Sequence, residues 1–525
     1  MKLNKILSIG AIFALALGLA SCDKGKNEPE NVNGGTGEKG WTSFTIALPT
    51  ASGLRAEAED VAKANRGDTY GGTVGEQKVS TVRIVLYKDD VVKHVFTPGI
   101  TANGTDAFTG EVSTEATATA TKSRFTTKAF QIEKAVYEVY VFLNPTEFVN
   151  NNTKEGTHKN ALMNNSAAYE EAKLTSNEGF FMSNAKGGVL TDVDANFKPT
   201  AAAAEAATAS VKVPVERAVA KVFVNSSVSG VANEAKAEVK RFALDVINKK
   251  YYAVRHMGFT TDGTTPELKE TTADARMKSY AVDPNMKGDP KLFAIAEPKD
   301  LTDEFSYIGA GKTFAGPDFP HTVKTAGFSD ENGIYVAENT MDAAEQFEVA
   351  TTRVVFEVVY APQGIELGKS FVEYKGMTFK PEAFQAKIDA YVADDTKTDA
   401  DLGMPAGFTD AVKALGTDTK LDFTTKSFVN GDIKFYLNGV SYYKTTIRHF
   451  HDDLDKGNTD VDMHYGRYGV VRNNIYKLSI TKISGPGEPE IPEPEKEIPD
   501  DPNKNYIAVD VDVLPWLVRT QDVEL

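Results

Sequence analysis

The sequence predicts a mainly β protein with two β-sandwich-like domains, a few helices and a separate C-terminal strand. Runs rich in β-branched and aromatic residues recur along the whole chain, and loops rich in Gly, Asp and Asn separate them. After an apolar N-terminal leader roughly 500 residues remain, which is enough for two domains. One last strand pattern follows a segment rich in proline and acidic residues. These observations favour packed sheets over a helical fold.

The chain begins with a signal-peptide pattern. Lys2 and Lys5 precede an apolar run over residues 6–19, which is too short to cross a bilayer. The sequence L-A-S-C that ends at Cys22 looks like a bacterial lipobox, so we expect removal of residues 1–21 and acylation of the cysteine. The alternative is an ordinary secretory signal that ends at a cysteine by chance. Cys22 is the only cysteine of the sequence, so the mature chain relies on its core rather than on disulfides.

The first strand pattern covers residues 44–48 and follows a polar tether over residues 23–40. Its apolar side chains alternate with small or polar residues, as in a half-buried strand; they are Phe44, Ile46 and Leu48. A loop-like stretch without apolar periodicity follows and contains Arg55 and Arg66.

The middle of the chain combines strand patterns with one predicted helix. Residues 80–87 and 134–145 are β-branched and aromatic and are typical of central strands. Residues 161–174 are rich in helix formers and predict a helix. An Ala-rich segment turns into a strand by Val211, where we place the boundary between the two domains.

The second half carries further strands at 241–248, 353–360, 433–450 and 473–484. Residues 485–505 hold prolines and acids that we expect to extend without packing. In the closing segment apolar residues alternate with small or acidic ones, at Ile507, Val509, Val511 and Val513. A lone strand cannot satisfy its own backbone, so this one must add to its own sheet or to that of a neighbour.

Composition and motifs exclude several classes of function. The formal charge of −16 repels phosphate backbones, so no nucleic acid partner is expected. No later apolar run is long enough to span a membrane, and membrane contact is expected only through the lipid on Cys22. The sequence contains no nucleophile elbow, zinc-protease motif or phosphate-binding loop. We therefore expect no enzyme activity and no cofactor.

Three short motifs favour plain interpretations. Arg66, Gly67 and Asp68 spell an integrin-type tripeptide, but three-residue matches are common by chance. Imidazole and carboxylate groups that could ligate a metal lie close together, although a solvated strand end is the simpler interpretation; they are His449, His451, Asp452 and Asp453, followed by residues 460–464. Tyr442 and Tyr443 are expected to alternate between core and surface rather than to form a ligand platform.

Several stretches resemble the fimbrilins of Bacteroidales, or type V pilins, and within them the short (minor) fimbrium subunits of the Mfa group. The likeness is carried by LASC before the tether, FTIALPTASGLRAEAED (44–60), VERAVAKVFV (215–224), NGVSYYKTTIRHF (438–450), YGRYGVVRNNIYKLSITKISGPG (465–487) and DVDVLPWLV (510–518). GVVRNNIYKLSI is the most specific of these. Together they cover both halves of the chain but not the loops between them.

The resemblance implies two transthyretin-like β-sandwich domains and assembly by strand exchange. A lipidated precursor reaches the outer membrane, and an arginine-specific protease cuts between Arg55 and Ala56, with Arg66 as the reserve site. The first strand then leaves with its lipid, and the C-terminal strand of a neighbour fills the groove. The donor residues would be Ile507, Val509, Val511, Val513, Trp516 and Val518. The resemblance divides the chain into a signal peptide (1–21), a lipidated propeptide (22–55), an N-terminal domain (56–210) and a C-terminal domain (211–484). A linker (485–505) and the donor strand (506–525) follow.

The residues make this scheme physically reasonable, because the first and last strand patterns offer the same alternating apolar face. Burying four or five such side chains contributes on the order of 10 kcal/mol before ordering costs. The expected product is a homopolymer on the cell surface that adheres to host or bacterial receptors and contacts accessory subunits. The alternatives are an anchor, accessory or tip subunit, or a monomeric surface lipoprotein that binds glycan or protein and keeps its last strand in its own sheet.

Overall fold

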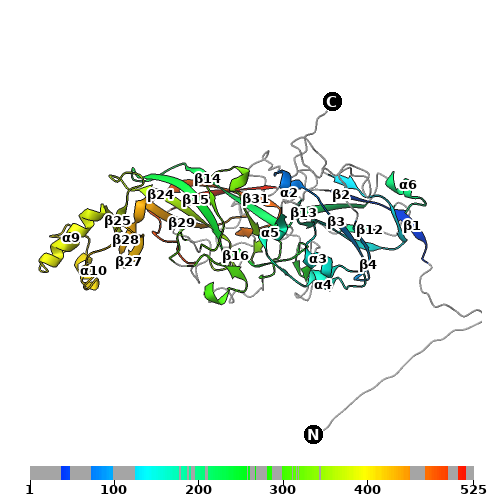
Figure 1. The fold of residues 1–525 in the computed structure, drawn as a ribbon, viewed down its shortest axis with the longest axis horizontal. Helices are drawn as coiled ribbons and strands as arrows, with labels where there is room; N and C mark the ends of the chain where they lie inside the picture. The colour runs from blue at the N-terminus through cyan, green and yellow to red at the C-terminus, as the bar shows by residue number, and fades with distance from the viewer. Residues whose placement is uncertain are drawn as a thin grey trace, which may run out of the picture. The chain divides into compact units, whose positions relative to one another are not determined.

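The computed structural model describes residues 37–47, 73–97, 124–176, 179–185, 188–190, 196–206, 211–256, 258–259, 266–267, 281–286, 298–309, 311–314, 316, 319–341, 345–449, 467–494 and 507–515. Residues 39–525 form one compact unit, and all the elements below lie in it (Figure 1). The described part is mainly β, as the sequence predicts. No helix in it is long and apolar enough to cross a membrane.

The N-terminal part is built on one eight-stranded sheet of order β4-β3-β7-β11-β13-β2-β5, with β12 also beside β7. A single hydrophobic core packs against this sheet and includes Phe44, Val85, Val141 and Val213. The strands are β2 (Phe44–Ala47), β3 (Val82–Lys88), β4 (Val91–Phe96), β5 (Arg124–Thr126), β7 (Tyr137–Leu143), β11 (Met182–Asn184), β12 (Gly188–Leu190) and β13 (Val211–Arg217). The predicted strands 80–87 and 134–145 correspond to β3 and β7.

Short elements surround this sheet. β1 (Lys39–Thr42) pairs with β6 (Phe130–Glu133), and β9 (Thr175–Ser176) pairs with β10 (Gly179–Phe180). The helices are α2 (Val74–Gln77), α3 (Glu147–Asn152), α4 (Asn160–Met163), α5 (Glu171–Leu174) and α6 (Ala201–Glu205).

The single helix predicted over residues 161–174 is wrong. The segment forms α4, the short strand β8 (Ala167–Ala168) and α5 instead. Asn164, Asn165 and Ser166 interrupt the helix formers, and such residues favour turns over helix interiors. Ala167 and Ala168 then pair with β17 (Lys250–Tyr251).

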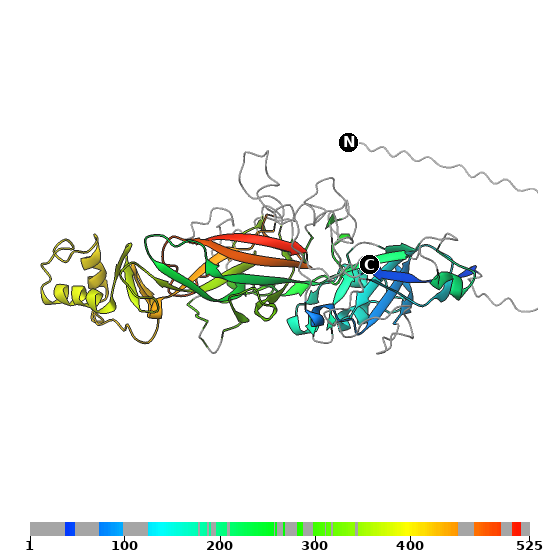
Figure 2. The same ribbon diagram turned by 90° about the horizontal axis from the view of Figure 1, so that it is seen from above.

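The C-terminal part is a sandwich of two four-stranded sheets, of order β22-β14-β31-β32 and β21-β15-β24-β29. The two sheets enclose one core, in which Val222 and Leu478 of the first sheet meet Phe242 and Phe356 of the second. The strands are β14 (Val219–Val228), β15 (Lys236–Asp245), β21 (Val323–Thr325), β22 (Ile334–Ala337), β24 (Arg353–Ala361), β29 (Val440–Thr446), β31 (Asn474–Ile483) and β32 (Ile507–Pro515). Figure 2 shows β32, in red, running beside β31.

A separate module is inserted between β24 and β29. Its sheet has the order β26-β25-β28-β27, and helices α9 (Pro381–Ala393) and α10 (Phe408–Ala414) lie on one face of it (Figure 1). Its own core contains Tyr374, Phe384, Phe408 and Phe435. The strands are β25 (Phe371–Tyr374), β26 (Met377–Phe379), β27 (Phe428–Asn430) and β28 (Ile433–Tyr436). The predicted long strand 433–450 is therefore divided, because the turn η4 (Leu437–Gly439) separates β28 from β29.

Small paired strands and turns complete the second part of the chain. They are β16 (Ile247–Asn248), β18 (Gly258–Phe259), β19 (Pro266–Glu267), β20 (Phe305–Ser306), β23 (Asn339–Thr340), β30 (Gly469–Val470), η1 (Pro298–Asp300) and η2 (Asp330–Asn332).

The expected domain boundary at residue 211 lies too early. Strand β13 belongs to the N-terminal sheet, where it pairs with β11 and β2. The change of sheet comes at Ala218, between β13 and β14. The apolar run over both strands hides this change from the sequence, since β13 is buried in the N-terminal core and β14 contributes residues to both cores.

The proline-rich segment after β31 also differs from its prediction. Residues 485–494 pack on the sandwich instead of extending away from it, and Gly485, Gly487, Pro489 and Ile491 are buried. Alternate small or apolar residues let this segment lie flat on the protein, while its acidic residues are half-buried or exposed and Glu488 forms an ion pair with Lys434.

Candidate functional site

The first strand lies in the interior of the N-terminal sheet. β2 runs parallel to β13 on one side, with Phe44 opposite Val211, and antiparallel to β5 on the other, with Ile46 opposite Phe125. Phe44 and Ile46 are completely buried. Strand β2 therefore fills a slot between two neighbours. Leu48, the third predicted residue of this strand, lies outside the described residues.

Strand β1 continues this segment on a second set of partners. β1 pairs with β6, and Trp41 exchanges two backbone hydrogen bonds with Lys198, at 2.8 and 2.7 Å. Gly40 sits under Phe197 so closely that a Cβ would lie 2.7 Å from the Cβ of Phe197. Residues 39–47 thus occupy one continuous track through the N-terminal part.

The terminal strand β32 pairs with β31 of the same chain. The register places Val509 opposite Ile480, Val511 opposite Leu478 and Val513 opposite Tyr476. Val509 is half-buried against the core of the sandwich. The sequence does not decide whether this strand joins its own sheet or the sheet of a neighbour. In the structure it joins its own sheet. Trp516 and Val518 lie outside the described residues.

The expected processing sites also fall outside the described residues. They are Cys22, Arg55, Ala56 and the tripeptide Arg66–Asp68. The description resumes at helix α2, which begins with a capping box between Thr73 and Glu76. Here the Thr73 backbone N–H donates to Glu76 Oε2 at 2.5 Å.

The side chain of Glu76 is fully buried and binds partners from the C-terminal sandwich. Its Oε1 accepts hydrogen bonds from Lys221 Nζ and from Tyr335 OH, each at 2.6 Å. Burial raises the pKa of Glu76, but Lys221, Tyr335 and Arg217 together outweigh burial and hold this pKa below its usual value. The carboxylate is therefore ionised, and it ties α2 to strands β14 and β22.

Arg217 extends this junction between the two parts. Its Nε donates to the backbone oxygen of Glu76 at 3.0 Å, and its Nη1 reaches Asn473 Oδ1 at 3.4 Å. Burial lowers the pKa of Arg217 to about 10, so it stays charged near neutrality. The sequence carried a signal for this site, because Glu216, Arg217 and Lys221 are charged residues in the otherwise apolar stretch VERAVAKVFV. Sequence reasoning assigned them no role.

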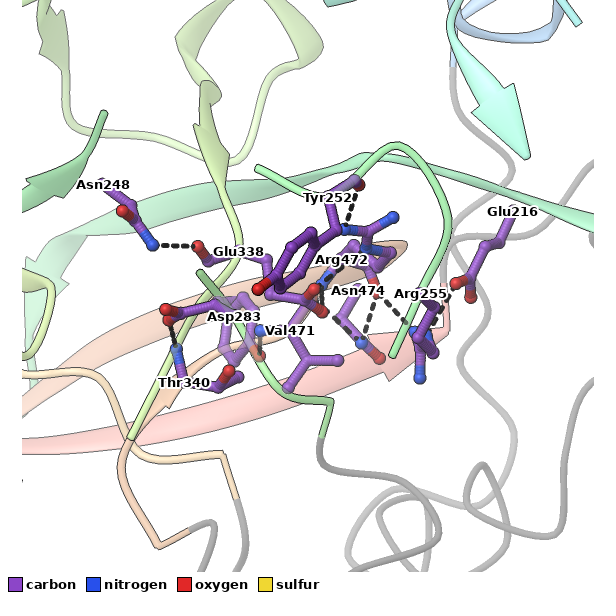
Figure 3. Close-up of polar contacts among 11 residues, drawn as sticks. Glu216, Asn248, Tyr252, Arg255, Asp283, Glu338, Thr340, Val471, Arg472 and Asn474 are labelled. Atoms are coloured by element: carbon purple, nitrogen blue, oxygen red, sulfur yellow. Dashed lines mark hydrogen bonds and ion pairs between the residues drawn. The ribbon is translucent and has the colours of Figure 1, made fainter. Parts of the chain in front are cut away.

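A second polar network surrounds the start of β31 (Figure 3). Arg472 Nε donates to Glu338 Oε2 at 3.0 Å, and its Nη2 donates to the backbone oxygen of Tyr252 at 2.8 Å. Arg255 forms a buried ion pair with Glu216 at 2.6 Å. Arg472 is the arginine of the motif GVVRNNIYKLSI, which sequence reasoning used only as a family likeness. Its contacts fix the loop that leads into the strand paired with β32.

Where the structure describes them, the histidine and tyrosine residues of the predicted ligand motifs are buried and make ordinary packing and hydrogen-bond contacts. His449 is buried, and its Nδ1 lies 2.7 Å from Tyr476 OH. His451, Asp452, Asp453 and residues 460–464 lie outside the described part, in which no group of His, Cys, Asp or Glu could hold a metal ion. Tyr442 and Tyr443 point to opposite faces as predicted, but both are buried, since loops and residues 485–494 cover the outer face.

Residues 434–522 match the family described as "Major fimbrial subunit protein type IV, Fimbrillin, C-terminal". This segment contains β28, β29, β31 and β32. The C-terminal region of this mainly β chain is therefore similar to that of fimbrial subunits. Over this C-terminal region the match agrees with the family-level prediction.

Three solved structures that match this chain come from Parabacteroides distasonis and Porphyromonas gingivalis. A putative cell adhesion protein from Parabacteroides distasonis is 14% identical, with 91% of this chain and 100% of that chain covered and a TM-score of 0.40. The fimbrilin FimA from Porphyromonas gingivalis is 14% identical, covering 91% and 99%, with a TM-score of 0.38. The truncated tip fimbrial protein Mfa3 of Porphyromonas gingivalis is 10% identical, covering 91% and 100%, with a TM-score of 0.33.

Proposed function

We propose that this chain is a shaft subunit that polymerises by exchange of its terminal strand. A lipidated precursor, anchored in the outer membrane through Cys22, would be cut after Arg55, or after Arg66 as the reserve site. Residues 39–47 would then leave their track. The terminal strand of a second copy would take their place, and repetition would build the fimbrium.

The observation that carries the proposal is the interior position, between β13 and β5, of a strand that precedes the proposed cut. Phe44 and Ile46 belong to the main core of the N-terminal part, and β2 has hydrogen-bonded neighbours on both sides. Losing this strand would expose apolar side chains and two unpaired strand edges, which is a strong drive for strand addition. Each large apolar side chain buried again contributes about 1.5–3 kcal/mol.

The terminal strand suits this slot in length and pattern. β32 has 9 residues, the same length as the segment 39–47 that would leave. Among the described strands, β32 lies at the edge of its sheet and pairs with β31. In the slot it would have neighbours on both sides. Exchange therefore adds a second ladder of backbone hydrogen bonds, which favours the polymer and makes it slow to dissociate.

The polymer would adhere through receptors on host or bacterial surfaces and would meet accessory subunits at its ends. An anchor subunit would escape the cut and keep residues 22–55 with the lipid. A tip subunit would accept a strand without needing to donate one. Both roles are compatible with the fimbrillin match, and the outcome of processing distinguishes them.

One observation favours a second candidate function. Because β32 completes a sheet of its own chain, the protein could be a monomeric surface lipoprotein that binds glycan or protein. In that case trimming after Arg55 would not lead to assembly.

The deciding experiment treats the chain that begins at residue 23 with an arginine-specific protease. Mass spectrometry finds the new N-terminus, and gel filtration and electron microscopy follow particle size. A matched chain that ends at residue 505 lacks the terminal strand. The proposal expects a start at Ala56, filaments from the full-length sample and monomers from the truncated one. A trimmed full-length sample that stays monomeric would support the lipoprotein instead.

A further inference from the structure

The segment that follows β31 is fastened across the second sheet of the sandwich and the inserted module. We call residues 485–494 the strap. Tyr443 OH donates to the backbone oxygen of Gly485 at 2.8 Å, and Tyr436 OH donates to that of Gly487 at 2.7 Å. Both tyrosines are buried. The strap is thus bound by side chains of β28 and β29. Both strands are distant in sequence from β32, the strand that would be donated.

The middle of the strap adds a short stretch of sheet. Tyr442 and Glu488 exchange two backbone hydrogen bonds, at 2.7 and 2.9 Å, in an antiparallel bridge. Lys434 Nζ also lies 2.8 Å from Glu488 Oε1. The edge of β29 is therefore capped by the strap, which shields part of it from pairing with another chain.

The last part of the strap is held by a hydrophobic anchor. Ile491 is 1% exposed and packs in a small core with Phe314 and Tyr442. Its backbone N–H donates to Lys312 O at 3.0 Å, and the Nη2 of Arg353 donates to the backbone oxygen of Pro492 at 2.5 Å. These contacts fix the chain up to about residue 494.

Gly487 shows how closely the strap lies on β29. A Cβ added at this position would be 2.3 Å from the backbone oxygen of Tyr442 and 3.1 Å from Cδ2 of Tyr443. Contacts below 3.0 Å with a backbone atom cannot be relieved by a side-chain rotation. Glycine is therefore required here for the strap to sit flat.

We propose that the strap stays on its own subunit when the terminal strand is donated, so that the exchanged arm begins after Pro494. This inference rests on the proposed function. The hydrogen bonds of the strap go to β24, β28, β29 and the loop at Lys312, whereas β32 pairs with β31. Release of β32 breaks none of them.

A fixed strap sets the reach of the arm. The chain takes 13 residue steps from Pro494 to Ile507, and at no more than roughly 3.6 Å per step they span at most about 47 Å. The acceptor is thus a second copy of this chain whose empty first-strand track begins within that distance of the donor's strap. The strap acts as the anchoring point that spaces neighbouring subunits.

Disulfide locks test the inference, because the chain that begins at residue 23 contains no cysteine. The strap lock is Tyr442→Cys with Glu488→Cys, at a hydrogen-bonded antiparallel pair where Cα atoms are about 5.5 Å apart. The strand lock is Ser479→Cys with Asp510→Cys, which are opposite each other in the β31–β32 register. Each variant is trimmed with the arginine-specific protease and assembled in oxidised and reduced form.

The strap lock is expected to assemble equally in both forms, and the strand lock only after reduction. If the oxidised strap lock lowers assembly at least tenfold and reduction restores it, the strap must detach and the inference is wrong. If the oxidised strand lock assembles freely, or if the unlocked chain never assembles, the proposed function fails instead.

Hydrogen exchange tests the strap without any assembly. In the monomer the amides of Glu488 and Ile491 are expected to be protected, and Gly487→Ala should speed their exchange at least tenfold. Gly316→Ala is the matched control, because a Cβ there meets its nearest atom at an ordinary 3.5 Å. Fast exchange of both amides in the unmodified monomer would overturn the inference whether or not filaments form.

Discussion

Nζ of Lys221 lies 2.6 Å from Oε1 of Glu76, and both side chains are 0% exposed. Glu76 follows the arginine-containing segment, whereas Lys221 lies in the first strand of the C-terminal sandwich. The pair therefore fastens the chain just beyond the expected cut. We infer that α2 keeps its place when the residues before it are removed, so that processing empties one track without loosening the junction.

Breaking this pair on one side should be strongly destabilising. Glu76→Gln leaves the Lys221 ammonium buried without its counter-charge, and the free energy of unfolding should fall by about 3–5 kcal/mol. The double variant Glu76→Gln with Lys221→Met should lose much less than the sum of the two single losses. Urea titrations of the three variants measure this coupling.

The control is Lys173→Met, which removes an ion pair with Glu170 whose side chains are 63% and 54% exposed. Exposed pairs of this kind contribute little to stability, because solvent screens them. Single variants at Glu76 and Lys221 that were no worse than Lys173→Met would show that the buried pair does not hold the junction.

A cavity created at strand β2 should lower the stability of the uncut chain but not that of the processed polymer. Phe44→Ala removes a fully buried ring from the N-terminal core and should lower the stability of the uncut chain by about 3–5 kcal/mol. After trimming and assembly the residue is gone, so filaments should dissociate at the wild-type temperature. Val136→Ala, at a side chain that is 56% exposed, serves as the control. Altered filament stability in Phe44→Ala would mean that residue 44 is retained in the polymer.

The sequence was sufficient for elements with a strong local period. The alternation at Phe44 and Ile46, and at Val509, Val511 and Val513, predicts strands that the structure contains. Local periodicity does not say which sheet a strand joins. The placement of β32 on β31 depends on contacts between distant segments, and the same pattern suits either its own sheet or a neighbour's.

Two features escaped prediction because their causes are nonlocal. Glu76 and Lys221 are far apart in the chain, and their burial follows from the junction of two cores rather than from either segment. The strap was expected to extend because proline and acidic residues seldom pack. It packs because Gly487 permits a close approach to β29 and because Ile491 contacts the apolar side chains of Phe314 and Tyr442 in the folded sandwich. Neither partner is recognisable in the local sequence.

The terminal strand should tolerate a change that prevents assembly without unfolding the monomer. Val509 is half-buried against the sandwich core, and Val509→Asp places a carboxylate there and in any slot that the strand enters. After trimming, filament formation followed by light scattering should fall at least tenfold, while near-UV circular dichroism of the monomer stays close to wild type. Val392→Asp, at a residue that is 55% exposed, should assemble normally. Wild-type assembly of Val509→Asp would exclude β32 as the donor.

The buried carboxyl of Asp283 should make stability depend on pH in a specific direction. Burial raises its pKa to about 7, although it accepts backbone hydrogen bonds from Thr340 and Asn285. Between about pH 4 and pH 7 the folded state therefore binds a proton that the unfolded state has lost. Stability from this group is present at low pH and is lost as the pH rises toward 7, by up to about 4 kcal/mol.

Urea titrations at several pH values can isolate this contribution by comparing wild type with Asp283→Asn. The difference in unfolding free energy between the two proteins should shift in favour of the variant as the pH rises from 4 to 7. Asp395→Asn, at an exposed position, should follow the wild-type profile throughout. The neighbouring His256 works in the opposite direction, since burial lowers its pKa and acid then destabilises the fold, but it is present in all three proteins and cancels in the comparison. Parallel profiles for wild type and Asp283→Asn would show that the carboxyl titrates alike in the folded and unfolded chain.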